Sequence, residues 1–112
     1  MKKHLPPIIS LILITSSLHL NAADDIQNGA LKYQTNCLVC HGTKGMGDGP
    51  AASTLSNKPA NLVKKLNSFF KPRMMLSYRV LEGKVEQGMP AWKGILTKQD
   101  TYDVFAYIES IQ

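Results

Sequence analysis

The segment Cys37-Leu38-Val39-Cys40-His41 carries the most specific chemical signal in this chain of 112 residues. Two cysteines three positions apart on a helical turn project to similar sides, so each thiol can add to one vinyl group of a haem. The next residue, His41, then falls beneath the iron and can offer it an imidazole nitrogen. This spacing is typical of covalent c-type haem attachment.

Three other uses of the cysteine pair have less support. A thioredoxin-like redox pair needs a βαβ context, and the sequence shows no convincing strand. A zinc site needs four protein ligands, whereas His4 and His19 lie in an N-terminal segment that we expect to be removed. A disulfide between Cys37 and Cys40 would close a loop too short to stabilise the fold appreciably.

The haem iron of an electron carrier needs a sixth ligand, for which methionine, lysine and water are the candidates here. The expected mature chain has four methionines, namely Met46, Met74, Met75 and Met89. Met46 follows the motif's histidine too closely to reach the other haem face. Met74 and Met75 lie on a helical pattern, where methionine more often packs in a core. Met89 lies in an irregular segment stiffened by Pro90, so we predict Met89 as the ligand, with Met75 as the alternative.

Residues 1–22 have the three regions of a secretory signal peptide: a basic start, an apolar run over residues 5–20, and small residues at the end. A membrane-spanning helix needs about 20 apolar residues, and this run is shorter and interrupted by prolines and polar residues. We expect cleavage after Ala22, with an uncleaved anchor as the alternative. Residues 23–112 then form one domain, exported to the periplasm.

The charge and the length exclude several classes of protein. Lys and Arg number 13 against 8 Asp and Glu, and the net charge of +5 falls when the two lysines of residues 1–22 are removed. The basic residues are dispersed rather than arranged as a nucleic-acid-binding stripe, although Lys64-Lys65 and residues 71–73 could form a weak steering patch. The length allows a single small domain and excludes large catalytic folds.

Four helical segments are predicted, and no strand. The first covers residues 24–37, because acidic residues suit a first helical turn. A short second helix opens at residues 59–62 with a proline at or near its first position. The third covers residues 72–83 and ends at a glycine. The last begins at Thr97, where a near capping box precedes an apolar stripe. That stripe is read as core: Val104, Tyr107, Ile108 and Ile111.

Over nearly all of residues 24–112 the chain resembles the class I cytochrome c family. Besides the attachment motif, Gly29 and Tyr33 stand eight and four residues before Cys37, matching the glycine and aromatic where the family's first helix crosses its last. Tyr107 matches the aromatic residue of the last helix. The segment Gly88-Met89-Pro90-Ala91-Trp92 is similar to the family's axial methionine segment.

A glycine-rich loop, Gly47-Asp48-Gly49-Pro50, is similar to one found in bacterial members of the family. The resemblance places Pro50 where a family carbonyl accepts a hydrogen bond from the axial histidine. An apolar pocket is also implied, because an apolar surrounding disfavours the extra ferric charge. Its candidate wall residues, each equally explained as ordinary core, are Leu38, Leu62, Phe69, Leu76, Val80 and Ile95.

The resemblance implies an all-α class I cytochrome c fold, about four helices and loops wrapped around one covalently bound haem c. It implies a monomeric one-electron carrier rather than an enzyme, similar to cytochrome c6, c553 and c551-like carriers. His41 and Met89 would ligate the iron, and the partners would be redox proteins that donate and accept the electron. A haem subunit of a larger dehydrogenase or oxidase is the alternative, and a haem enzyme or gas sensor with an open iron position is a third.

Overall fold

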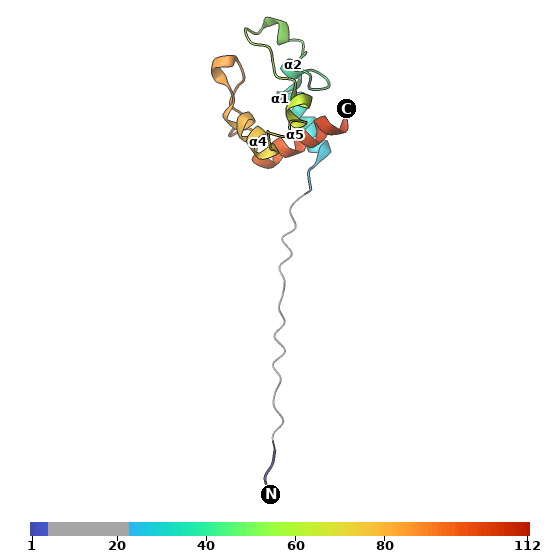
Figure 1. Ribbon diagram of the computed structural model, residues 1–112, viewed down its shortest axis with the longest axis vertical. Helices are drawn as coiled ribbons and strands as arrows, with labels where there is room; N and C mark the ends of the chain where they lie inside the picture. Colours follow the sequence, from blue (N-terminus) through green and yellow to red (C-terminus); the bar gives the residue numbers. More distant parts are fainter. Residues whose placement is uncertain (5–22) are drawn as a thin grey trace.

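Figure 1 shows the computed structural model, which describes residues 1–4 and 23–112. Most of the predicted signal peptide therefore lies outside the described residues. The described residues contain α-helices, short 3-10 helices and loops but no strand, so the all-α prediction is confirmed. The only pairings of strand type there are two isolated bridges, between Lys84 and Met89 and between Lys93 and Leu96.

The helical elements follow the predicted order with three additions, the short helices α2, η1 and η2. Their bounds in chain order are α1 Ile26–Asn36, α2 Leu38–His41, η1 Ala52–Thr54, α3 Leu62–Leu66, α4 Arg73–Glu82, η2 Val85–Gln87 and α5 Lys98–Ser110. The attachment motif forms its own short helix, α2, directly after α1. In Figure 1, α5 runs along the base, and α2 and the segment after α4 (orange) rise on opposite sides.

The helix ends follow local capping chemistry. Asp25 caps α1 by accepting a hydrogen bond from the Asn28 N–H, and Thr97 and Asp100 form a complete capping box at the start of α5. The third predicted helix is also found, since α4 lies between Pro72 and Gly83. The short helix α3 begins later than predicted, because the side chain of Asn61 caps it, so its preceding proline is not a first-turn residue.

Helices α1 and α5 cross in close contact at Gly29, as predicted. A Cβ atom at Gly29 would overlap the backbone carbonyl of Asp103 and touch the backbone nitrogen of Val104. One turn further along α1, the rings of Tyr33 and Tyr107 pack with their centroids 5.6 Å apart. The crossing therefore depends on a residue without a side chain, followed by an aromatic pair.

The buried core is small and lies between these two helices. Its main cluster consists of Tyr33, Val104, Phe105 and Ile108. Val104 and Ile108 belong to the predicted stripe of α5, whereas Tyr107 and Ile111 are only partly buried and Phe105 was not anticipated. No helix of the described part is long and apolar enough to cross a membrane.

A polar network fastens the start of α1 to α5. The buried carboxylate of Asp103 accepts hydrogen bonds from the Asp25 N–H at 2.8 Å and from the side chains of Asn28 and Gln99. Burial alone would raise the pKa of Asp103, but these donors outweigh it and hold that pKa below its ordinary value. The network therefore favours an ionised carboxylate at neutral pH.

Candidate functional site

The two cysteines and the histidine of the motif are brought together by the turn between α1 and α2. The N–H of Cys37 donates to the Tyr33 carbonyl at 2.9 Å, and the N–H of His41 donates to the Cys37 carbonyl at 2.9 Å. The thiols of Cys37 and Cys40 are free and partly exposed. The motif therefore forms the predicted helical turn over Leu38–His41, whereas Cys37 is the turn residue that joins α1 to α2.

The two thiols differ in environment. Burial, and then the neighbouring Cys40 thiol, raise the pKa of Cys37 to about 12. A thiol with this pKa stays protonated at neutral pH, and the thiolate is the form that attacks a disulfide or is oxidised. Burial therefore holds the Cys37 thiol of the unattached chain in its protonated form.

The His41 imidazole is buried and has one fixed partner. Its Nδ1 lies 2.9 Å from the carbonyl oxygen of Ala60, and because a carbonyl only accepts, Nδ1 carries the proton. Burial lowers the pKa of His41, although the Ala60 carbonyl acts in the opposite sense. A neutral ring with Nδ1–H occupied leaves Nε2 free as the ligand atom.

The prediction that Pro50 supplies this carbonyl is wrong. Pro50 is exposed, and its neighbours Gly49 and Ala51 donate to the carbonyls of Cys40 and Val39, at 3.1 and 2.9 Å. The loop thus lies against the back of α2, away from the Nδ1 atom. The carbonyl of Ala60, directly before the Asn61 cap of α3, reaches His41 instead.

A second set of contacts holds the loop behind His41. The Tyr33 hydroxyl, buried in the core, donates to the Gly42 carbonyl at 2.5 Å, and the Leu62 N–H donates to the Gly45 carbonyl at 2.6 Å. Burial raises the pKa of Tyr33, so the phenol remains a donor. The sequence predicted Tyr33 as a helix-crossing aromatic but missed this hydrogen bond, because it joins a side chain to a loop carbonyl.

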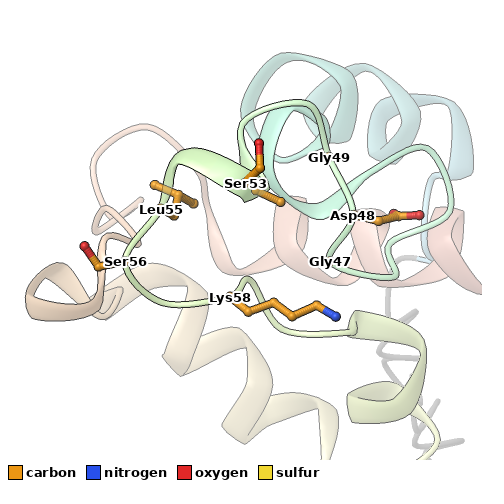
Figure 2. Close-up of a pocket in the computed structure, with 8 residues that line it drawn as sticks. Gly47, Asp48, Gly49, Ser53, Leu55, Ser56 and Lys58 are labelled. Atoms are coloured by element: carbon orange, nitrogen blue, oxygen red, sulfur yellow. The ribbon is translucent and has the colours of Figure 1, made fainter.

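The loop between Gly47 and Lys58 encloses an open pocket of about 540 Å³. Figure 2 shows its lining residues, which include Asp48, Leu55 and Lys58. A Cβ atom at Gly88 would lie 3.8 Å from Cδ2 of Leu55. The far end of this loop therefore lies beside the residue that precedes Met89.

Met89 lies in a rigid loop rather than on a helix, as the sequence predicted. Its N–H and carbonyl both pair with the backbone of Lys84, at 3.1 and 2.9 Å. The segment that follows is fixed to the end of α4, because the Trp92 N–H donates to the Val80 carbonyl at 3.3 Å. A Cβ atom at Gly83 would overlap the backbone of Pro90. Met89 is thus held by its own bonds to Lys84 and by the fixed segment that follows it.

Met74 and Met75 are placed differently from the prediction. Met74 and Met75 lie on α4, but their exposed fractions of 64% and 48% show that they are not core residues. Met46 is also exposed, in the loop directly after α2. Met89 is half-buried.

The apolar side chains around the motif suit a large flat hydrophobic group. Leu38, Leu62, Leu76 and Val80 pack on the core cluster but are only partly buried, so their outer sides have no protein cover. Phe69 and Ile95, also predicted as pocket wall, are instead exposed. Together with two free thiols and a neutral imidazole, this incomplete core fits a covalently attached haem.

The comparisons with known proteins agree with this geometry. Residues 26–112 match the family model described as cytochrome c. Cytochrome c6 of Thermosynechococcus vestitus is 29% identical over 100 residues, which cover 89% of this chain and 82% of that protein. A 1-butanol dehydrogenase (cytochrome c) of Thauera butanivorans is 31% identical over 86 residues, 76% of this chain but only 11% of the dehydrogenase.

A solved structure, the reducing HAO-like protein complex of Kuenenia stuttgartiensis, has a similar fold with a TM-score of 0.63 at 24% identity. The match covers 77% of this chain and 43% of that one. The fold and the site define a class I monohaem c-type cytochrome. The chain belongs to the cytochrome c family, and it carries covalently bound haem c and takes part in electron transfer.

Proposed function

We propose that this cytochrome is a periplasmic one-electron carrier whose iron is ligated by His41 and Met89. The observation that carries the proposal is that hydrogen bonds to the backbone hold each of the two proposed ligand residues in place. The His41 ring is held by Ala60, and Met89 is held by paired backbone bonds to Lys84. Two ligands on rigid backbones favour electron transfer, because the coordination geometry then changes little between oxidation states.

The residues at the proposed site hold the haem and adjust the properties of its iron. The haem supplies a one-electron couple between ferrous and ferric iron. Donation from Nδ1–H of His41 to the Ala60 carbonyl fixes the ring and makes Nε2 more basic. The thioether sulfur of Met89 favours the ferrous state relative to a second histidine, and so raises the reduction potential. Cys37 and Cys40 fix the haem on α2 by two thioether bonds.

A carrier role rather than an enzymatic one follows from the same assignment. An enzyme or gas sensor needs an open iron position, which Met89 would fill. We infer that residues 1–22 direct export and are removed, which leaves a monomer free to meet a donor and an acceptor protein. Similarity to a cytochrome c6 over most of both chains supports this choice.

The second candidate is a haem subunit of a larger oxidoreductase. It is favoured by the partial match to the Thauera butanivorans dehydrogenase, in which the similar segment is a small part of the whole. Size-exclusion chromatography of a periplasmic extract separates the candidates. A carrier elutes as a monomer of the cleaved chain plus one haem, whereas a subunit elutes with other polypeptides.

Replacement of Met89 tests the ligand assignment. In Met89→Ala we expect the haem to remain attached through Cys37 and Cys40, while the sulfur-to-iron absorption band disappears. The reduction potential should fall, and the reduced protein should bind carbon monoxide. The control is Met75→Leu, which nearly conserves volume and should keep the band. The assignment to Met89 is wrong if Met75→Leu removes the band and Met89→Ala keeps it.

A further inference from the structure

The carbonyl that holds the His41 ring belongs to a peptide group whose direction depends on the next residue. Ala60 accepts from the His41 Nδ1–H at 2.9 Å, and Asn61 follows Ala60 in the chain. The carbonyl of Ala60 and the N–H of Asn61 lie in one planar peptide group. The dihedral angle φ of Asn61 therefore sets the direction in which this carbonyl points relative to α3.

The conformation of Asn61 is held by its own side chain. Asn61 is the N-cap of α3, with an extended backbone at φ −74° and ψ 104°, and its side-chain oxygen accepts from the Lys64 N–H at 3.0 Å. This bond ties the cap residue to the first turn of the helix. A helix of five residues gains little from its own backbone bonds. The cap is therefore a large part of what fixes the entry to α3.

The loop that follows His41 packs against the same stretch. The Gly47 N–H donates to the His41 carbonyl at 2.8 Å, and the Leu62 N–H donates to the Gly45 carbonyl at 2.6 Å. A Cβ atom at Gly47, where φ is +82°, would overlap the carbonyl oxygen of Pro59. The loop thus holds the two ends of the stretch 59–62, and the cap turns the peptide group between them.

We propose that Asn61 is a positioning residue for the haem-ligating histidine, acting through the Ala60 carbonyl to orient the His41 ring and lower the reduction potential. Donation from Nδ1–H to a well-aimed carbonyl makes Nε2 a more basic ligand. A more basic ligand favours the ferric state, and hydrogen bonding around a ligand is one means by which a protein sets the potential. A cap that only stabilised α3 would leave the ring and the potential unchanged.

The inference rests on the proposed ligation by His41. It does not depend on Met89 as the second ligand or on the carrier role, because the contacts that carry it lie between the attachment helix and α3. Both the ring and the capping side chain are observed directly, and only one peptide group separates the two hydrogen bonds.

NMR and redox titration of the haem-loaded protein test the proposal. In the reduced protein, the signal position of the His41 Nδ1–H reports the length of its hydrogen bond, and the exchange rate reports how often that bond opens. Asn61→Ala removes the cap but leaves the Asn61 carbonyl that accepts from the Lys65 N–H at 3.2 Å. The exchange rate should rise about fivefold, the usual effect of losing one N-cap. The signal should move upfield and the reduction potential should rise.

Two further variants at the same position define the role of the side chain. Asn61→Ser should keep the signal, the exchange rate and the potential of the unaltered protein, because serine caps about as well as asparagine. Asn61→Gln keeps the amide but moves its oxygen by one methylene, so it should behave like Asn61→Ala. The glutamine variant provides the test if the alanine variant does not retain haem.

The matched control is the cap of another helix. Thr97 caps α5, and its side chain accepts from the Asp100 N–H at 3.0 Å. Thr97→Ala should lower the denaturant midpoint to a similar extent, while the His41 signal and the potential stay in place. The proposal is overturned if Thr97→Ala changes them as much as Asn61→Ala does, or if Asn61→Ser fails to preserve them.

The ring signals of the unaltered protein separate this inference from the proposed ligation. A histidine bound beneath a haem has ring protons that are displaced far upfield in the reduced protein. If the His41 ring is not displaced, ligation by His41 is wrong and the inference falls with it. If the ring is displaced but does not respond to Asn61→Ala or Asn61→Gln, the inference alone is overturned.

Discussion

The Nδ1 atom of His41 and the carbonyl oxygen of Ala60 lie 2.9 Å apart, although 19 positions separate the two residues in the chain. This hydrogen bond joins the attachment helix α2 to the segment that caps α3. It orients the imidazole independently of any second iron ligand. The restraint on the histidine ring thus comes from the entry to α3, whereas the glycine-rich loop holds only its backbone, through the Gly47 N–H that donates to the His41 carbonyl at 2.8 Å.

The first prediction follows from this bond. Pro59 restrains the backbone just before the Ala60 carbonyl, so Pro59→Ala should loosen the acceptor and expose the His41 Nδ1–H to solvent. Pro50→Ala, in an exposed turn, should leave it unchanged. The measurement is the solvent-exchange rate of that proton by NMR in the reduced protein. Faster exchange in Pro50→Ala than in Pro59→Ala would contradict the placement.

The second prediction concerns the crossing of α1 and α5. Gly29→Ala should destabilise the protein by about 1–3 kcal/mol, because its Cβ would meet the Asp103 carbonyl. This cost exceeds the gain of up to about 1 kcal/mol from better helix propensity. Denaturant unfolding measures it, with Gln34→Ala on the exposed side of α1 as the control. A more stable Gly29→Ala protein would show that the helices do not meet there.

The third prediction concerns the Tyr33 hydroxyl. Tyr33→Phe keeps the ring in the core but leaves the Gly42 carbonyl without its partner, which should cost about 1–3 kcal/mol. Because Gly42 directly follows His41, the NMR signals of the histidine ring should shift as well. Tyr107→Phe, on the other ring of the pair, should leave those signals in place. Identical histidine signals in Tyr33→Phe would limit the hydroxyl to a purely stabilising role.

The fourth prediction is a pH dependence. The pKa of Asp103 is lower in the folded chain than its unfolded value of about 3.9. Its stabilising contribution is therefore complete above that value and is lost as the pH falls towards the folded pKa. Asp103→Asn should unfold more easily at neutral pH and lose less stability on acidification than the unaltered protein. Parallel acid-unfolding curves for the two proteins would count against this contribution.

The sequence by itself determined the chemistry and most of the helical order. The attachment motif, the Thr97 capping box, the glycine at the helix crossing and the irregular setting of Met89 are local patterns. Each depends on spacing along one turn or one loop, so each can be read from neighbouring residues. The class of protein followed from these patterns together.

Only the tertiary structure decided the contacts between distant segments. The sequence pointed to the carbonyl of Pro50 as the partner of His41. The path of the chain selected the carbonyl of Ala60 instead, because the loop around Pro50 lies against the back of α2. The exposure of Phe69 and Met74 was likewise decided by which face of each segment meets the core. Sequence spacing specifies local geometry, whereas a partner across the fold depends on how the helices pack.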